Sequence, residues 1–427
     1  MRIYNESTKQ WVTTRKNIQY GIVYIDDNYI EFGYFNPNET EKLVEVNDTV
    51  YPCINTILDK YFIYCNYSGF YIPTRYASPD YINKYTCAKG QGSFPYSFEK
   101  KYEAVENFSI FNNKHIIETN IPYKLAEYMP YTFGIEFETS MGYVPQDKCF
   151  KDGLIPLRDG SISGLEYSTI VLKGNEGLNL LHQQIRDLKA YTSFNKECSL
   201  HIHFGNYPIT EKHLYILYKA CLVFQNSIAR YVPSLTFESG RYKRNGKNYC
   251  NPLPEFYNFS EIYKYMTDRP FFGDFTQPHP SDITKTAKWK ISQRYYCVNF
   301  INALCYKGPK TIEFRFLRPT YNFRVIYLWL AIFNALLQKS EDVVNNYNTV
   351  CNTILFEDLP DNVIRPFYNI PALLTSVYGN DVSFCDFLLD EADKLYIAVR
   401  NQERNDDYCG RDISFINEIF NPEDAVL

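Results

Sequence analysis

Two glutamates alternate with aromatic residues in one short segment of the chain. Tyr131–Thr139 has the sequence YTFGIEFET, and side chains in an extended strand alternate between two faces. The apolar side chains then share one face, and Glu136 and Glu138 share the other, with their carboxylates about 6.6 Å apart at about 3.3 Å per residue. An edge strand with a solvated face would have the same pattern, so this segment alone leaves both interpretations open.

The same alternation recurs in three further segments, each of which predicts a strand with one apolar and one polar face. The segments and their polar residues are Ser199–Gly205 (SLHIHFG) with His201 and His203, Thr311–Leu317 (TIEFRFL) with Glu313 and Arg315, and Gly164–Leu172 (GLEYSTIVL) with Glu166. If the four strands belong to one sheet, one of its faces collects four glutamates, two histidines and one arginine.

Four carboxylates on one face repel one another, and burying them unpaired is costly. Divalent cations resolve this repulsion, because Mg²⁺ prefers carboxylate, phosphate and water oxygens and a histidine can add one nitrogen ligand. The combination predicts a site with two metal ions that handles phosphate groups. Two histidines at this spacing also fit a zinc hydrolase, although four neighbouring carboxylates suit hard cations better than zinc.

The composition is that of an ordinary globular protein. The 427 residues include 44 Lys and Arg and 49 Asp and Glu, so the formal net charge is −5. A protein that binds nucleic acid specifically usually has an excess of basic residues, so we expect no specific nucleic-acid partner. Dividing the length by about 150 residues per domain gives about three domains. Tyr and Phe number 40 and 31, and because aromatic residues favour strands, this usage predicts more sheet than average.

Cysteine usage and hydropathy favour a cytoplasmic location. The 12 cysteines include no CxxC pair, and Met1–Trp11 has no signal-peptide pattern, which predicts reduced thiols in a cytosolic protein. The longest apolar stretch, Val325–Leu337, is shorter than the about 20 residues that span a bilayer and predicts a buried helix. We therefore expect no membrane partner.

The pattern of elements divides the chain into three expected parts. Residues 1–125 predict a β-rich, Tyr-rich accessory domain, 126–325 a mixed core that carries the charged strands, and 326–427 a helical part that packs on this core. Apolar residues at helical spacing predict amphipathic helices over 178–188 and 214–228, the second with Thr210 as its N-cap. A further helix is expected over Phe384–Val399.

A basic segment lies between the histidines and the last charged strand. It reads ESGRYKRNGKNYCNPL and contains Arg241, Lys243, Arg244 and Lys247. A solvated loop is the usual form of such a charge run. The alternative is a mobile lid that reaches over an anionic substrate or nucleotide, and the sequence leaves both open.

The charged segments together resemble the amidoligase family. This family belongs to the carboxylate–amine ligase superfamily, with glutamine synthetase and glutamate–cysteine ligase. The matching elements are GIEFET at Gly134–Thr139, RDGSISGLEYS at Arg158–Ser168, CSLHIHFG at Cys198–Gly205, RYYCVN at Arg294–Asn299 and TIEFRFL at Thr311–Leu317. They occur in the family's order over about residues 128–325, and 126–325 is therefore expected to be the amidoligase catalytic core.

The resemblance implies both a fold and an activity. The implied fold is α+β, with a glutamine-synthetase-like antiparallel sheet that carries the metal site on its concave face and is backed by helices. The implied activity is ATP-dependent amide bond formation between a carboxylate and an amine, through an acyl phosphate and with Mg²⁺ or Mn²⁺ as cofactor. Peptide or protein side chains are compatible as substrates.

The resemblance also implies roles for individual residues. Glu138 and Glu166 correspond to ligands of one Mg²⁺, near the amine substrate, for which Asp159 is a candidate third ligand. The ligands of the second Mg²⁺, which binds the nucleotide phosphates, are Glu136, His201 and Glu313. The catalytic and nucleotide-binding side chains are His203, Arg294 and Arg315, with the arginines holding phosphate oxygens and the reacting carboxylate.

Two alternatives remain at this point. One is a catalytically inactive, amidoligase-like structural or protein-binding module of phage or virion type, in which the Tyr-rich flanks would be the working parts. The presence of every charged residue of the pattern argues against it. The other concerns one residue: Arg315 would serve only an internal salt bridge to Glu313, two residues away on the same face.

Overall fold

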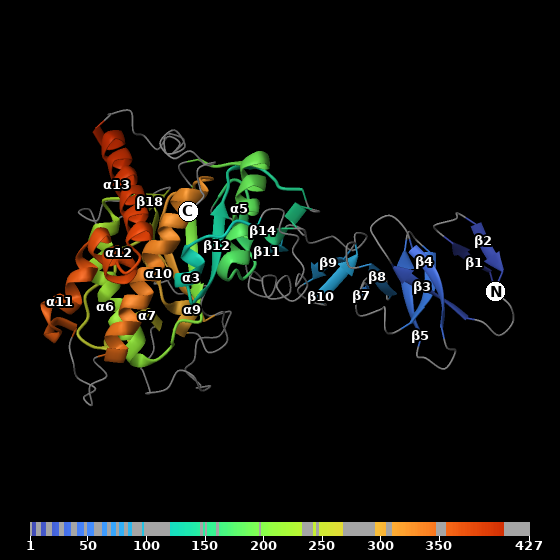
Figure 1. Cartoon of the computed structure of the whole chain (residues 1–427), viewed down its shortest axis with the longest axis horizontal. Coiled ribbons are helices and arrows are strands. Elements are labelled where there is room, and N and C mark those ends of the chain that lie inside the picture. Colours follow the sequence, from blue (N-terminus) through green and yellow to red (C-terminus); the bar gives the residue numbers. More distant parts are fainter. Residues whose placement is uncertain are drawn as a thin grey trace. The chain divides into compact units, whose positions relative to one another are not determined.

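The structure of the chain is a computed structural model, shown in Figure 1. Side chains are described for residues 120–145, 148–149, 152–158, 162–195, 198–232, 250–266, 295–304, 310–346 and 356–401. For the strands within 1–97 and 242–249, and for 267 and 402–404, the backbone alone is described. The chain divides into two units, Met1–Tyr96 with Glu106–Phe111 and Ser97–Val105 with Asn112–Leu427. The three-part division with boundaries at 125 and 325 stays a prediction.

The first unit is described through its strands. Antiparallel pairs are formed by β1 (Arg2–Asn5) with β2 (Gln10–Thr13), β3 (Gln19–Tyr24) with β4 (Ile30–Phe35), and β9 (Ala77–Asp80) with β10 (Lys84–Cys87). A four-stranded sheet in the order β6-β5-β8-β7 contains β5 (Glu41–Val46), β6 (Thr49–Ile54), β7 (Phe62–Cys65) and β8 (Phe70–Pro73).

An antiparallel sheet organises the second unit. Its strands are β14 (Leu154–Arg158), β15 (Glu166–Thr169), β12 (Thr132–Glu138), β17 (Leu200–Gly205), β21 (Ile312–Leu317) and β20 (Val298–Asn299), in this order. Each of these neighbouring pairs is antiparallel. A two-residue strand, β11, spans Tyr96–Ser97, at the sequence boundary between the two units. The four charged segments therefore lie side by side in one sheet, as expected, and the α+β class is confirmed.

The helices of the second unit follow the apolar spacing of the sequence. The predicted helices are found as α5 (Gly174–Tyr191), α6 (Glu211–Ile228), α10 (Phe323–Asn346) and α13 (Val382–Arg404). The predicted N-cap is confirmed, because Thr210 Oγ1 accepts a hydrogen bond of 3.3 Å from His213 N. The shorter elements are α3 (Leu125–Tyr128), α7 (Phe259–Thr267), α9 (Ile301–Leu304), η5 (Phe356–Asp358), α11 (Asp361–Ile364), η6 (Arg365–Tyr368) and α12 (Ile370–Tyr378).

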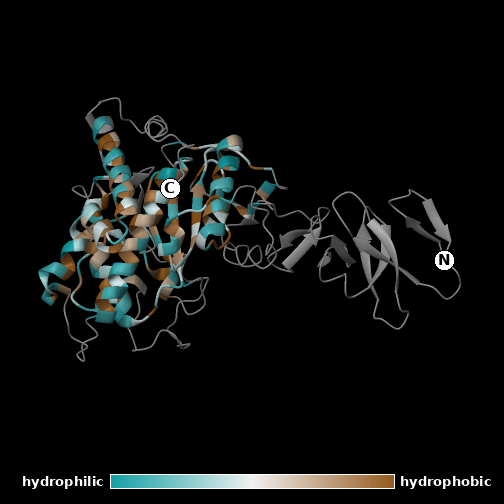
Figure 2. Ribbon diagram, in the orientation of Figure 1, coloured by the Kyte–Doolittle hydropathy of each residue, from teal (hydrophilic) through white to brown (hydrophobic). Residues whose placement is uncertain are grey.

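Helix α10 covers the apolar face of the sheet. Phe314 of β21 stacks on Phe333 of α10 with ring centroids 4.2 Å apart, and Phe316 lies 6.2 Å from the same ring. Phe204 of β17 contacts Phe314 edge to face at 6.0 Å. Figure 2 shows hydrophobic residues on both the strands and the helices of this unit. Because side chains alternate along a strand, the packed aromatic residues fix the glutamates and histidines on the other face.

Phe314→Ala is expected to lower the free energy of unfolding by about 3–5 kcal/mol, because it opens a cavity between β21 and α10. Phe314 is fully buried, whereas Tyr143 is 72% exposed. The control Tyr143→Ala should therefore change stability by no more than about 0.5 kcal/mol. Urea unfolding of both variants measures the difference, and equal losses would show that the face of β21 is assigned wrongly.

Two short pairs of antiparallel strands lie outside the main sheet. β13 (Met141–Gly142) pairs with β16 (Thr192–Ser193), and β18 (Tyr242–Arg244) pairs with β19 (Lys247–Cys250). The second pair lies in the basic segment, with Lys243 and Arg244 in β18 and Lys247 in β19. Arg241 lies outside the described residues, and the choice between a solvated segment and a lid stays a prediction.

The six cysteines with described side chains are buried: Cys149, Cys198, Cys221, Cys250, Cys297 and Cys385. Burial raises the pKa of the Cys221 and Cys297 thiols, as expected for cysteines that pack as small apolar groups. In the part of the chain that the structure describes, no helix has the length and hydropathy to cross a bilayer.

Candidate metal centre

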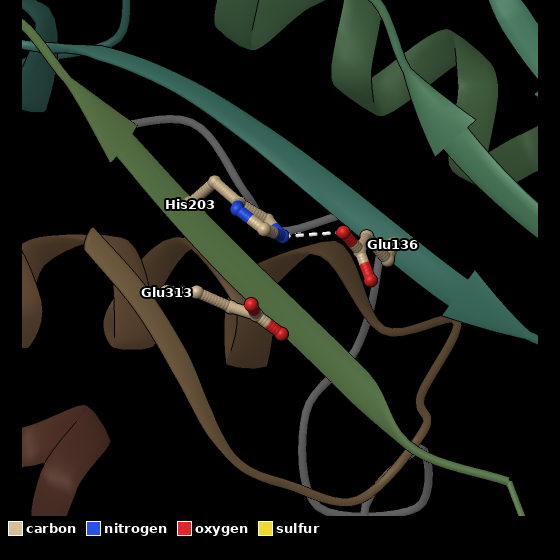
Figure 3. A group of neighbouring side chains, drawn as sticks. All are labelled: Glu136, His203 and Glu313. Atoms are coloured by element: carbon tan, nitrogen blue, oxygen red, sulfur yellow. Dashed lines mark ion pairs between the residues drawn. The ribbon is translucent and has the colours of Figure 1, made fainter. Parts of the chain in front are cut away.

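Three adjacent strands bring acidic and histidine side chains together. In the register of the sheet, Glu136 of β12 is opposite His201 of β17, and His203 of β17 is opposite Glu313 of β21. One possible ligand atom from each of Glu136, His203 and Glu313 lies within 4.8 Å of the others. Figure 3 shows these three side chains converging from their strands. The group has the spacing of a metal-binding site.

The polar face of the sheet is buried. Glu136, Glu138, Glu166 and Glu313 are each 5% exposed or less, and His201 is 3% exposed. Strand β12 lies between β15 and β17, so the alternative of a solvated edge strand is wrong. Because buried carboxylates are costly without compensating charge, their partners decide what this face can do.

Glu136 lies between the two histidines, and each of its carboxylate oxygens contacts one ring. His201 Nδ1 is 3.0 Å from Glu136 Oε2 and 3.6 Å from Glu313 Oε1. His203 Nε2 forms an ion pair with Glu136 Oε1, and His203 Nδ1 is 3.3 Å from Thr311 Oγ1. Both histidines therefore border Glu136, whereas the resemblance separates them into a metal ligand and a nucleotide contact. Their individual roles stay predictions.

Both carboxylate oxygens of Glu313 have partners. Arg315 Nη1 donates to Oε1, and Asn299 Nδ2 donates to Oε2 at 2.7 Å. Asn302 Nδ2 lies 3.5 Å from the same Oε2. Burial alone would raise the pKa of Glu313, but the Arg315 guanidinium and the neighbouring histidines lower it to about 2. Glu313 is therefore a fixed negative charge, held in place by Asn299 from the RYYCVN segment.

Arg315 is the cationic partner of this group. Its pair with Glu313 is the internal salt bridge considered from the sequence. Burial would lower the pKa of the guanidinium, but Glu313, Glu136 and Glu138 raise it. The Nε–H of Arg315 has no hydrogen-bond partner among the residues that the structure describes. Arg315 can thus compensate buried carboxylates and still donate a hydrogen bond to an anionic ligand.

A second pair of carboxylates lies beside the first group. Glu138 of β12 is directly opposite Glu166 of β15. The backbone N–H and the hydroxyl of Ser199 both donate to Glu138 Oε2 at 2.7 Å, and Ser168 Oγ donates to Glu166 Oε1 at 3.4 Å. Their position in neighbouring strands is compatible with the role expected for them at the first ion, which stays a prediction.

The pairing of β17 with β21 is irregular at the site. His201 lies between the register pairs Ile202–Phe314 and Leu200–Leu317, so the extra residue is on β21, in the part that contains Arg315. A bulge of this kind bends a strand and redirects its side chains, and bulges are common beside functional sites.

Some predicted site residues lie outside the described part of the chain, and some site residues were not predicted. Arg294 and Asp159 belong to the first class. The structure adds Ser199, Asn302 and Thr311, which contact the predicted ligands. Ser199 and Thr311 flank the HxH and ExR patterns, so their adjacency was a signal, whereas no spacing pattern marks Asn302 in α9.

The donor set suits a hard divalent cation. Carboxylate oxygens with one or two imidazole nitrogens are the ligands expected for Mg²⁺ or Mn²⁺. Glu136 and Glu313, with His201 and His203 beside them, are the residues that would hold such an ion. An ion there would also relieve the repulsion between the carboxylates of Glu136 and Glu313. Without an ion, this repulsion works against the lowering of the Glu313 pKa.

Comparison with known protein families supports the resemblance seen in the sequence. Residues 147–337 match a family model described as "Putative amidoligase enzyme". The match includes β17 and β21 with both histidines, Glu313 and Arg315, and it begins after β12. No curated protein and no solved structure matches the chain. The resemblance to the amidoligases is confirmed for this part of the chain.

Proposed function

From the amidoligase match and the buried carboxylate–histidine face, we propose that this protein is an ATP-dependent carboxylate–amine ligase that uses Mg²⁺ or Mn²⁺. The observation that carries the proposal is the buried group of Glu136, His203 and Glu313 beside Arg315. These residues come from segments that occur in the family's order. The proposal implies a glutamine-synthetase-like sheet with this group on its concave face.

The proposed reaction activates the carboxylate before the amine attacks. A carboxylate oxygen of the first substrate takes the γ-phosphoryl group of ATP, which gives an acyl phosphate and ADP. The amine nitrogen of the second substrate then attacks the acyl carbon, loses a proton and expels phosphate. Activation is needed because direct condensation in water would lose the resonance and hydration of the carboxylate.

Two ions are assigned to the face, and when bound they supply positive charge for the phosphate oxygens. Glu136, His201 and Glu313 would hold the ion near the nucleotide, and Glu138 and Glu166 would hold the ion near the amine.

The remaining assigned residues contact the reacting groups. Arg315 places a fixed positive charge beside Glu313, and its Nε–H, which has no partner among the described residues, can donate to charge that develops on the transferring phosphoryl group. Arg294 is assigned the same kind of contact on the family resemblance. His203 is assigned to the nucleotide or the transferred phosphoryl group.

Trapping with hydroxylamine tests the proposal without knowledge of the amine. The protein is incubated with ATP, Mg²⁺, hydroxylamine and pools of amino acids, short peptides and protein side-chain carboxylates. ADP and a hydroxamate should form together, and both should require ATP and Mg²⁺, which mass spectrometry detects. ATP hydrolysis that no carboxylate accelerates, with no hydroxamate in any pool, would count against the ligase.

The contacts of both histidines with Glu136 favour one second candidate, a zinc hydrolase. Metal analysis of the purified protein separates the two candidates. The ligase should bind ATP with Mg²⁺ or Mn²⁺, whereas the hydrolase should retain zinc and bind no nucleotide.

A further inference from the structure

Ser199 connects the two halves of the polar face. Its hydroxyl oxygen lies 2.7 Å from Glu138 Oε2 and 3.1 Å from His201 Nε2. The other ring nitrogen of His201 is 3.0 Å from Glu136 Oε2. Ser199 is 8% exposed, so water has little access to these contacts. One hydroxyl therefore joins the carboxylate assigned to the first ion to the histidine assigned to the second.

The number of donors fixes the direction of these hydrogen bonds. A serine hydroxyl has one hydrogen to donate, and a carboxylate oxygen can accept it. The shorter contact, from Ser199 Oγ to Glu138 Oε2, takes this hydrogen. Ser199 Oγ then accepts the Nε2–H of His201. A neutral imidazole with its hydrogen on Nε2 has a lone pair on Nδ1.

That lone pair completes a set of three acceptors. His201 Nδ1 faces Glu136 Oε2 and Glu313 Oε1 at 3.0 and 3.6 Å. With the hydrogen of His201 on Nε2, all three atoms are acceptors, and a cation between them would offset their repulsion. Histidines that bind metals almost always donate their other N–H to a protein acceptor or water, which fixes the tautomer and the orientation of the ring. Ser199 occupies the place of that acceptor.

We propose that Ser199 is a positioning residue that sets the tautomer of His201 for metal binding and ties this histidine to Glu138. The two metal positions are thereby built as one hydrogen-bonded unit. The inference rests on the proposed function, because it requires an ion at Glu136 and Glu313. The family resemblance assigns no role to Ser199.

Three variants of the whole chain test the contribution of the Ser199 hydroxyl. Ser199→Ala removes it, while the backbone N–H of residue 199 still donates to Glu138 Oε2. Ser199→Thr keeps a hydroxyl and serves as the rescue. Ser140→Ala is the matched control, since Ser140 is also 8% exposed but its hydroxyl donates to the carbonyl oxygen of Ser193 at 3.2 Å.

Titration with Mn²⁺, followed by electron paramagnetic resonance of the free ion, gives the first readout. Ser199→Ala should weaken Mn²⁺ binding about 10- to 100-fold, the usual effect of losing a partner of a metal ligand. Ser199→Thr and Ser140→Ala should bind Mn²⁺ like the wild type. Unchanged binding in Ser199→Ala, with melting temperatures equal to the wild type, would overturn the proposal.

The tautomer of His201 gives a second readout, which a purely structural role would not move. Nitrogen NMR of the histidines in the presence of Mg²⁺ should show hydrogen on Nε2 of His201 in the wild type, and a loss of this preference in Ser199→Ala. Hydrogen on Nδ1 in the wild type would overturn the proposal.

The outcomes also separate this inference from the proposed function. If the wild type binds Mn²⁺ and Ser199→Ala weakens this binding, but no carboxylate is activated, the proposed ligase activity is wrong and the role of Ser199 stands. A wild type that binds no Mn²⁺ would overturn both.

Discussion

Replacing Glu136 with glutamine is expected to abolish tight Mn²⁺ binding and leave the protein folded. Each carboxylate oxygen of Glu136 contacts one histidine ring. Glu136 also forms the possible metal-binding group with His203 and Glu313. Glutamine keeps the shape but removes the negative charge and one oxygen, so Mn²⁺ affinity should fall by at least about 100-fold, more than the 10- to 100-fold loss typical of an outer-shell partner. The fold should persist, because the Glu136 charge repels the Glu313 charge and works against the lowering of the Glu313 pKa.

A buried glutamate away from this face provides the control for Glu136→Gln. Glu391 of α13 is 1% exposed, and its two oxygens accept hydrogen bonds from Arg324 of α10 at 3.0 and 2.5 Å. Glu391→Gln should lower the melting temperature and leave Mn²⁺ binding unchanged. The two variants are compared by thermal melting in chelator and by Mn²⁺ titration. If Glu136→Gln bound Mn²⁺ like the wild type, the assignment of the metal centre would be wrong.

Arg315→Ala is expected to have two large effects with one cause. Removal of the guanidinium leaves Glu313 buried without its cation, and loss of one partner from a buried ion pair costs about 3–5 kcal/mol. In chelator the protein should therefore melt much earlier, and Mn²⁺ should restore part of the loss. ADP release should fall about 10²- to 10³-fold, because Arg315 acts on charge that develops as the phosphoryl group transfers. The loss should appear in turnover more than in nucleotide affinity.

Arg324→Ala distinguishes a general ion-pair effect from a role in the site. Arg324 also pairs with a buried glutamate, Glu391, but this pair joins α10 to α13. Its loss should destabilise the protein, and Mn²⁺ should not restore stability. If Arg315→Ala released ADP at the wild-type rate, Arg315 would serve only the internal salt bridge to Glu313. Arg294 would then be the better candidate for the phosphate contact.

The faces of the strands and the positions of the main helices could be predicted from the sequence. Period-two alternation assigns Phe314 to the core and Glu313 to the site, because only one face of β21 can pack on α10. The apolar spacing over 214–228, with Thr210 before it, was sufficient for α6 and its cap. These features depend on short-range periodicity, which a single sequence contains.

The contacts between strands could not be predicted, because they depend on register. The HxH pattern does not indicate that, in the register of the sheet, His201 is opposite Glu136 and His203 is opposite Glu313. It also does not indicate that the pairing of β17 with β21 shifts beside Arg315. The role of Ser199 follows only when β17 is placed next to β12. Asn302 reaches Glu313 from α9, and no periodic pattern connects these two residues.

Calorimetric titration with ATP tests the central claim most directly, because it needs no knowledge of the carboxylate or the amine. The wild type is titrated with ATP in Mg²⁺ and again in chelator, and Glu136→Gln is titrated in Mg²⁺. If the buried face of Glu136, His203 and Glu313 binds a metal–nucleotide complex, the wild type should bind ATP in Mg²⁺ but not in chelator. The Glu136→Gln variant should not bind ATP in Mg²⁺. Equal ATP affinity in Mg²⁺ and in chelator, or unchanged affinity in Glu136→Gln, would contradict the claim.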